Sequence, residues 1–292
     1  MKARIAVIGG SGVYQLSGAR LIEKIDVPTP FGMPSDLITV AEVGKQTVAF
    51  LPRHGKGHRL LPTEVPARAN IWALKSLGVE QILSISAVGS LREQFRPGDF
   101  ILCDQLIDRT RNRELSFFGD GLVAHVPFAA PFCPGMSEVI GGILEKGKHP
   151  FHDRGTLVTM EGPLFSTRAE SNLYRSWDAD LIGMTALPEV KLAREAEMCL
   201  AGIAMVTDYD CWRESEESVS VEMILKVMRG NTKAVQQLIP SIAAALSARG
   251  ECACHRAAEN TLVTDPALIP YETRRKLWLL YGKYWKGASP QE

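Results

Sequence analysis

The sequence predicts an α/β protein, with a single domain in which helices flank a central mixed β-sheet. Two observations carry this prediction. Short apolar segments typical of buried strands alternate with segments of helical periodicity, and two of the strands end in loops of small residues. The composition agrees, because 46% hydrophobic and 23% charged residues are typical of globular proteins. A chain of 292 residues has room for one large domain with a sizeable core.

The strands are predicted from apolar runs that turn residues interrupt. Residues 4–8 lead into Gly9-Gly10-Ser11-Gly12, and residues 82–86 lead into Ala87-Val88-Gly89-Ser90. Residues 37–43 and 47–51 flank Gly44-Lys45-Gln46, as the two strands of a hairpin do. Further short strands are predicted at residues 100–103, 155–160, 179–183 and 203–207.

Helical periodicity marks the remaining elements. Apolar residues recur at helical spacing from Val65 to Leu77 and stop at Gly78, a natural C-terminal cap, and residues 188–198 and 219–228 share this period. Residues 109–134 form a long loop, and a loop of this length in a compact domain is usually functional.

The composition changes after residue 246. We expect a main domain over residues 1–246 and a C-terminal extension over residues 247–292 with a terminal helix at 274–285. That helix is expected to pack on its own domain or across a subunit interface. A position on a membrane surface is the alternative, because cations accompany its apolar residues.

Charge and hydropathy exclude several partner classes. Lys and Arg together number 33, as do Asp and Glu, so no basic footprint for nucleic acid is expected. No apolar run approaches the ~20 residues of a membrane span, and the N-terminus lacks the apolar region of a signal peptide. Six cysteines, mostly in apolar contexts, fit a reducing compartment, so we expect a cytoplasmic protein.

Two glycine-containing loops suit a small anion such as phosphate. The loop after residue 8 fails the dinucleotide pattern, because Gln15 stands where the third glycine belongs, and no Lys follows as in a P-loop. Its backbone N–H groups and hydroxyl still fit phosphate, with a plain turn as the alternative. In the loop from residue 53 to 58, Arg53 offers a planar fork and His54 a second donor, although a solvated basic loop has the same pattern.

No metal site is expected. His54 and His58 lack a third ligand at suitable spacing, and Cys252-x-Cys254-His255 lacks a second Cys or His pair at the spacing of a zinc finger. Cys252 and Cys254 are expected to form either a strained disulfide or two free thiols.

Polar residues gather at three strand exits, within residues 161–171, 183–189 and 207–212. Open α/β sheets build ligand sites where such exits converge. These blocks belong to a larger series that resembles the trimeric purine nucleoside phosphorylases, and within them the branch that acts on 5′-methylthioadenosine. The motifs are Ile8-Gly9-Gly10-Ser11-Gly12, Pro52-Arg53-His54-Gly55, Asn70-Ile71-Trp72-Ala73-Leu74, Ser90-Leu91-Arg92, Pro131-Phe132-Cys133-Pro134, Glu161-Gly162-Pro163, Arg168-Ala169-Glu170-Ser171, Gly183-Met184-Thr185, Pro188-Glu189-Val190 and Thr207-Asp208-Tyr209-Asp210-Cys211-Trp212. The resemblance runs in register from residue 5 to residue 246, so it implies a phosphorylase domain over 1–246.

The resemblance implies cleavage of an N-glycosidic bond by inorganic phosphate, a co-substrate, with no cofactor. The implied phosphate ligands are Ser11, Arg53, His54, Ser86, Ala87 and Thr185. Phe165 and Met184 would hold the ribose, and Ser166, Asp208 and Asp210 the base. Asp208 would protonate or hydrogen-bond purine N7, and Asp210 would contact the exocyclic amine. Asp210 would also raise the pKa of Asp208.

The resemblance further implies a homo-oligomer, a trimer or a dimer of trimers. His125 would reach the 5′ substituent in a neighbouring subunit, where Val219, Val221, Ile224 and Leu225 would contact a methylthio group. His125 capping its own loop is the alternative.

Two competing functions remain at this stage. A phosphorylase of 6-oxopurine nucleosides would need Glu where Ser166 stands and Asn where Asp208 stands, so adenine-type substrates are favoured. A non-catalytic nucleoside-binding protein on the same fold is less favoured, because Arg53, His54 and both aspartates are present.

Overall fold

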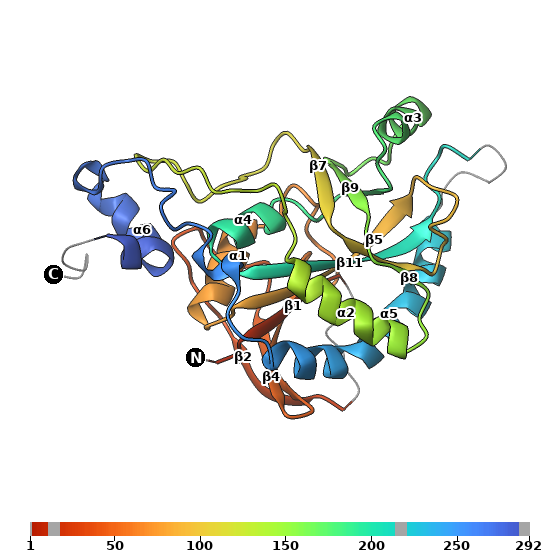
Figure 1. The fold of residues 1–292 in the computed structure, drawn as a ribbon, viewed down its shortest axis with the longest axis horizontal. Helices are drawn as coiled ribbons and strands as arrows, with labels where there is room; N and C mark the ends of the chain where they lie inside the picture. Colours follow the sequence, from red (N-terminus) through yellow and green to blue (C-terminus); the bar gives the residue numbers. More distant parts are fainter. Residues whose placement is uncertain (1, 11–17, 214–220, 286–292) are drawn as a thin grey trace.

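The computed structural model describes residues 2–10, 18–213 and 221–285, with side chains left out for 221–226. Within these residues, eleven strands form one mixed sheet with helices on both faces (Figure 1). The predicted α/β class, with a central mixed sheet flanked by helices, is confirmed.

The middle of the sheet is parallel. β1 (Ile5–Gly9) lies between β4 (Gln46–Pro52) and β5 (Gln81–Ser90), parallel to both. β11 (Cys199–Asp208) runs parallel to β5 along its other edge. On the far side of β4, β3 (Ile38–Val43) and β2 (Arg20–Ile25) continue the sheet as antiparallel strands. The carboxyl ends of β1, β4, β5 and β11 therefore meet at one edge.

The sheet branches at the carboxyl end of β5. Gly89 and Ser90 pair with β10 (Leu181–Gly183). β10 pairs in turn with β9 (Thr156–Met160), and β9 pairs with β7 (Gln105–Arg109). In the other branch, β11 pairs with β6 (Phe100–Cys103), and β6 pairs with β8 (Phe151–His152). The two branches separate where the parallel strands end.

Helices cover the two faces of the sheet. α2 (Pro134–Lys146) and α5 (Val221–Ser247) pack together on one face, and α1 (Ala67–Ser76) and α4 (Glu189–Glu195) on the other. α3 (Arg168–Ser176) lies beyond β7 and β9 (Figure 1). Each face of the sheet has its own apolar core, and β1 contributes to both, because successive side chains of a strand point to opposite faces. Ala6 and Ile8 face α1 and α4, whereas Ile5 and Val7 face α2 and α5.

Most local predictions are confirmed. The predicted hairpin is β3–β4, and the helix predicted from residue 65 to 77 is α1, followed by Gly78 with a φ of 88°. One prediction is wrong: residues 87–90 continue β5 rather than form a loop, because β11 extends far enough to pair with Val88 and Gly89. Residues 110–133 contain no helix or strand, as expected of the long loop.

The C-terminal segment crosses short 3₁₀ turns at Ala253–Arg256 and Pro266–Leu268, reaches α6 (Tyr271–Tyr281), and ends in a third turn at Gly282–Tyr284. Leu277, Leu280 and Tyr281 of α6 are buried in the same core as α1 and α4. Tyr281 also stacks on Phe118 of the long loop, with ring centroids 5.1 Å apart. The apolar face of α6 is therefore covered by its own chain. In the part of the chain that the structure describes, no helix is long and apolar enough to cross a membrane. The domain boundary at residue 246 stays a prediction.

Two adjacent leucines of α6 allow a matched test of this packing. The side chain of Leu280 is 3% exposed and that of Leu279 is 39% exposed. We expect Leu280→Ala to lower the free energy of unfolding by about 2–5 kcal/mol, because it leaves a cavity in the core. Leu279→Ala should change it by less than ~1 kcal/mol. Denaturant unfolding of both variants measures the difference, and equal small effects would show that α6 contributes little to the core.

Candidate active site

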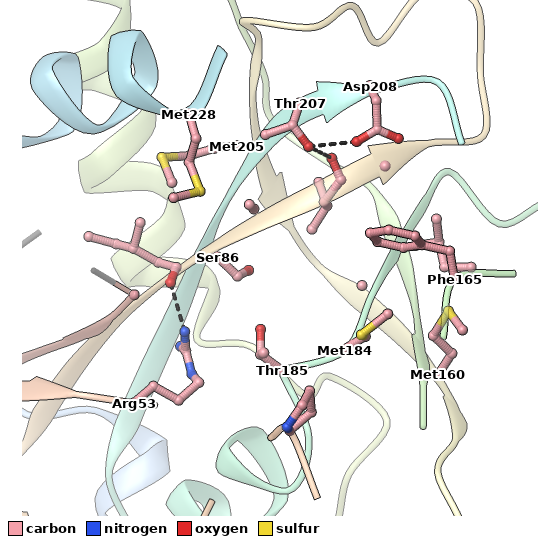
Figure 2. Close-up of a pocket in the computed structure, with 18 of the residues that line it drawn as sticks. Arg53, Ser86, Met160, Phe165, Met184, Thr185, Met205, Thr207, Asp208 and Met228 are labelled. Atoms are coloured by element: carbon pink, nitrogen blue, oxygen red, sulfur yellow. Dashed lines mark hydrogen bonds between the residues drawn. The ribbon is translucent and has the colours of Figure 1, made fainter. Parts of the chain in front are cut away.

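A cavity of about 460 Å³ opens where the branches of the sheet separate (Figure 2). Its walls come from the ends of β4, β5, β10 and β11, from the segment after β9, and from α5. Ten of the predicted site residues line it: Arg53, His54, Ser86, Ala87, Phe165, Ser166, Met184, Thr185, Asp208 and Asp210. Residues from five separate parts of the sequence thus share one cavity.

Of the other six predicted site residues, only His125 has its side chain described. Ser11 and Val219 lie outside the described residues, and so do the side chains of Val221, Ile224 and Leu225, although these three begin α5. α5 does reach the cavity one turn later, through Met228 and Thr232. His125 is exposed, does not line the cavity, and donates its backbone N–H to Thr261 O at 3.1 Å.

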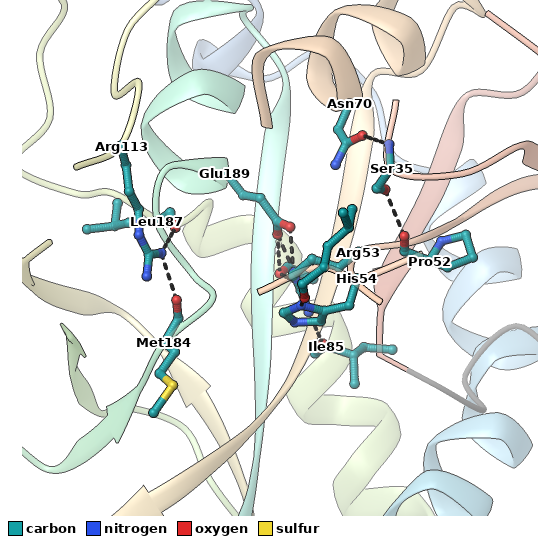
Figure 3. Close-up of polar contacts among 12 residues, drawn as sticks. Ser35, Pro52, Arg53, His54, Asn70, Ile85, Arg113, Met184, Leu187 and Glu189 are labelled. Atoms are coloured by element: carbon teal, nitrogen blue, oxygen red, sulfur yellow. Dashed lines mark hydrogen bonds and ion pairs between the residues drawn. The ribbon is translucent and has the colours of Figure 1, made fainter. Parts of the chain in front are cut away.

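Arg53 is fixed by a buried ion pair. Its side chain is 2% exposed, and its Nε and Nη2 lie 2.5 and 3.0 Å from the two carboxylate oxygens of Glu189 (Figure 3). Nη2 also donates to Ser84 Oγ at 2.9 Å, and Nη1 donates to Ile85 O at 2.9 Å. The guanidinium of Arg53 was predicted to bind phosphate through its planar face of N–H groups. This prediction needs correction, because Nε and Nη2 are bound to Glu189. Four of the five N–H groups of the guanidinium are used in these hydrogen bonds. The fifth, on Nη1, remains as a donor for an anion.

His54 is a neutral acceptor rather than the predicted second donor. Its Nδ1 lies 2.9 Å from Leu60 O, and because a carbonyl only accepts, Nδ1 carries the proton. Burial, reinforced by the charge of Arg53, lowers the pKa of His54 to about 4. The neutral ring therefore presents an unprotonated Nε2, which suits the P–OH group of hydrogen phosphate. The ring stacks on His58 with centroids 4.3 Å apart.

Two carboxyl groups stand at the opposite end of the cavity. A β-bulge after Val206 changes the register of β11 against β5, and bulges of this kind re-aim side chains near sites. Asp208 accepts from Thr207 Oγ1 at 2.7 Å (Figure 2) and from the backbone N–H of Asp210 at 2.8 Å. Gly89 permits this approach, since a Cβ there would lie 3.0 Å from Asp208 Oδ1.

The carboxyl that the structure holds toward its protonated form is Asp210. Burial raises its pKa, and the neighbouring charge of Asp208 raises it further. The raised pKa was instead expected at Asp208. The two carboxyl groups do influence one another as expected, because like charges this close oppose double ionisation.

The wall between the two ends is apolar. Phe165, Met160, Met184, Met205 and Met228 contribute a ring and four thioethers (Figure 2). Phe165 and Met184 were predicted here, whereas the other three methionines were not. Flexible, polarizable thioethers adapt to irregular apolar groups, so this wall suits a sugar face or a small alkylthio substituent.

Arg113 of the long loop is a positioning residue that the sequence analysis missed. Its side chain is 2% exposed. Its guanidinium donates to the carbonyls of Met184 and Leu187 at 2.7 and 2.6 Å (Figure 3), and to those of Glu161 and Met160 at 2.7 and 3.2 Å. Arg113 therefore connects the segment after β10 to the end of β9 by hydrogen bonds. The only signal in the sequence was the length of the loop that carries it.

Comparison with known proteins identifies the family. Residues 4–244 match the model of the phosphorylase superfamily. The S-methyl-5′-thioadenosine phosphorylase of Thermosynechococcus vestitus is 50% identical over 97% of this chain and 100% of its own. That of Koribacter versatilis is 48% identical over 98% of each chain.

Solved structures agree. A methylthioadenosine phosphorylase from an Antarctic soil metagenomic library superimposes with a TM-score of 0.88 and 46% identity, covering 95% of this chain and 98% of that one. The methylthioadenosine phosphorylase of Schistosoma mansoni in complex with adenine gives a TM-score of 0.81 at 37% identity, covering 92% and 98%. The chain belongs to the phosphorylase superfamily and, within it, to the S-methyl-5′-thioadenosine phosphorylases, as its motifs predicted.

Proposed function

We propose that this protein catalyses the phosphorolysis of 5′-methylthioadenosine to adenine and 5-methylthioribose 1-phosphate. The observation that carries the proposal is the layout of the cavity. Arg53, Ser86 and Thr185 lie at one end and Asp208 at the other, with Phe165 and Met184 beside the space between (Figure 2). The family of the chain supports the same reaction.

The reaction breaks the bond between C1′ and N9 and forms one between C1′ and a phosphate oxygen. The ribose becomes cationic in the transition state, and the electron pair of the broken bond leaves with the base. Catalysis therefore needs an anion beneath C1′ and a proton donor at purine N7. Phosphate is a co-substrate, and this chemistry requires no further cofactor.

The phosphate end supplies donors and one acceptor. In the proposal, Nη1 of Arg53, the hydroxyls of Ser11, Ser86 and Thr185, and the backbone of Ala87 donate to phosphate oxygens. His54 Nε2 accepts from the P–OH group, which orients the remaining charged oxygens toward C1′.

The base end supplies the proton. Asp208 acts at N7, and Asp210 and Ser166 contact the amino side of the purine. Burial and the neighbouring charge of Asp208 raise the pKa of Asp210, so the pair of carboxyl groups favours holding a proton. Such a proton can move to the leaving base, so adenine departs neutral.

The 6-oxopurine alternative is not favoured by the comparisons. An exocyclic amine donates to a carboxylate oxygen, whereas a 6-carbonyl oxygen has no hydrogen to donate to it. A mismatched polar group in a buried base pocket costs several orders of magnitude in rate.

We also propose that the enzyme is a homotrimer or a dimer of trimers and that it works in the cytoplasm. His125 supports the assembly, because it is exposed on the long loop and lies outside the cavity of its own chain. In this arrangement His125 completes the 5′ pocket of a neighbouring subunit, opposite Val219, Val221, Ile224 and Leu225.

The substrate is tested by initial rates with methylthioadenosine, adenosine and inosine, each with and without phosphate. We expect turnover only with phosphate, and kcat/KM for inosine at least ~100-fold below that for methylthioadenosine. Burial of the methylthio group should favour methylthioadenosine over adenosine by roughly 5- to 30-fold. Comparable values for inosine would exclude the proposed specificity, and turnover without phosphate would exclude phosphorolysis.

The proton donor and the shared site are tested together. Asp208→Asn should lower kcat on methylthioadenosine by at least ~100-fold with an unchanged fold, because an amide cannot deliver the proton. His125→Ala should impair the 5′ pocket. If the site is shared, subunit exchange between these two impaired variants restores some activity, since some sites then carry neither substitution. No recovery in verified mixed oligomers would contradict a shared site.

The phosphate role of Arg53 is tested without leaving a buried charge. The double variant Arg53→Ala/Glu189→Gln removes the guanidinium and neutralises its partner. We expect the KM for phosphate to rise about 10- to 100-fold, with the KM for the nucleoside changed only a few-fold. Glu189→Gln alone, which keeps Arg53, is the control. Equal increases in both KM values would show that Arg53 supports the whole site rather than the anion.

A further inference from the structure

Four cysteines from three distant parts of the sequence meet at one point. Cys133 directly precedes α2, Cys199 is the first residue of β11, and Cys252 and Cys254 follow α5. Their four Sγ atoms all lie within 4.8 Å of one another, and those of Cys133 and Cys252 are 3.7 Å apart. This cluster lies at the opposite end of β11 from Asp208, about 30 Å along the strand at ~3.3 Å per residue.

The spacing of the sulfurs fits a metal ion better than disulfides. A tetrahedral Zn²⁺ with Zn–S bonds of about 2.3 Å places its four sulfurs about 3.8 Å apart. A disulfide brings two sulfurs to about 2.05 Å and joins them in pairs. In the structure, all four of these thiols are free and converge together. Four sulfurs that are all neighbours of one another can surround one central ion, whereas disulfides would join them only in pairs.

The cysteine cluster is buried on all sides except at Cys252. Cys133, Cys199 and Cys254 are 1%, 0% and 5% exposed, whereas Cys252 is only partly buried. Cys133, Cys199 and Cys254 belong to one apolar core, and Cys252 packs against it. Cys252 therefore marks the entry side.

Polar groups that can donate to thiolate sulfur surround the cluster. Arg249 Nη2 lies 3.6 Å from Cys133 Sγ, and Gly135 leaves room for it, because a Cβ there would lie 2.8 Å from Nη2. His255 Nε2 lies 3.5 Å from Cys199 Sγ. Cys133 is also the N-cap residue of α2, where no side chain caps the helix and the N-terminal amides favour negative charge. Such neighbours are typical of the groups that tune thiolate metal sites.

We propose that Cys133, Cys199, Cys252 and Cys254 form a tetrahedral structural site for Zn²⁺. Binding makes four Zn–S bonds and releases the thiol protons to solvent. All four positions are filled by protein sulfur, so the ion has no open position for a substrate and acts on the fold. It joins the segment after α5 to β11 and α2. Cys252 and Cys254 lack a second Cys or His pair nearby in the sequence, and the fold supplies that pair from Cys133 and Cys199.

The test is the metal content of the full-length enzyme, purified with a thiol reductant and without chelators or metal columns, then supplied with Zn²⁺ and desalted. We expect about one zinc per chain by elemental mass spectrometry. Cobalt substitution should give the visible absorption of tetrahedral Co²⁺ together with thiolate charge-transfer bands. A chelator should lower the Tm of the wild-type enzyme.

Two variants make the assignment specific. Cys252→Ser changes the least buried ligand, so it should fold, lose the zinc and show no response of Tm to chelator. Cys103→Ala changes a buried cysteine outside the cluster and should retain the metal. The proposal is overturned if reduced wild-type enzyme supplied with Zn²⁺ holds none, if Cys252→Ser retains the full content, or if mass spectrometry finds these cysteines paired as disulfides that exclude the ion.

Discussion

The buried pair of Arg53 and Glu189 is the constraint on which the phosphate end of the cavity depends. It joins the end of β4 to the first turn of α4, and through Ser84 and Ile85 it also holds β5. Removing one partner of such a pair leaves an uncompensated buried charge and costs about 3–5 kcal/mol. The strand ends that carry His54 and Ser86 are therefore held in one geometry before any substrate binds. A donor that is already oriented loses little entropy when an anion arrives.

The polar groups of the cavity are segregated along its length. A guanidinium and neutral donors stand at one end, and two carboxyl groups that disfavour double ionisation stand at the other. Between them lies an apolar wall of methionines and Phe165. Because charge develops at both ends of the substrate during glycosidic cleavage, with a cationic sugar between, this order of groups matches the transition state. An apolar wall strengthens each of these interactions by lowering the local dielectric constant.

The sequence predicts what short segments determine. Strands such as β1 and the hairpin β3–β4 follow from apolar runs and turns, and motifs select ten residues that share the cavity. β2 and α3 escape prediction because the first is largely exposed and the second carries few apolar residues. The partners of Arg53, the tautomer of His54 and the four carbonyls held by Arg113 depend on contacts between distant segments. A one-dimensional pattern contains no signal for these, although each decides what a predicted residue can do.

The two ends of β11 show how the fold separates stability from chemistry. At its carboxyl end the strand bulges and places Asp208 against Gly89, where open α/β sheets bind their ligands. At its amino end Cys199 joins three other cysteines in a packed cluster that lines no part of the cavity. The bulge and the acid pair place side chains accurately only if the position of the strand is fixed elsewhere. Parallel pairing with β5 along most of β11 supplies part of that support, and in the proposed metal site the ion bound by Cys199 would hold the strand where it begins.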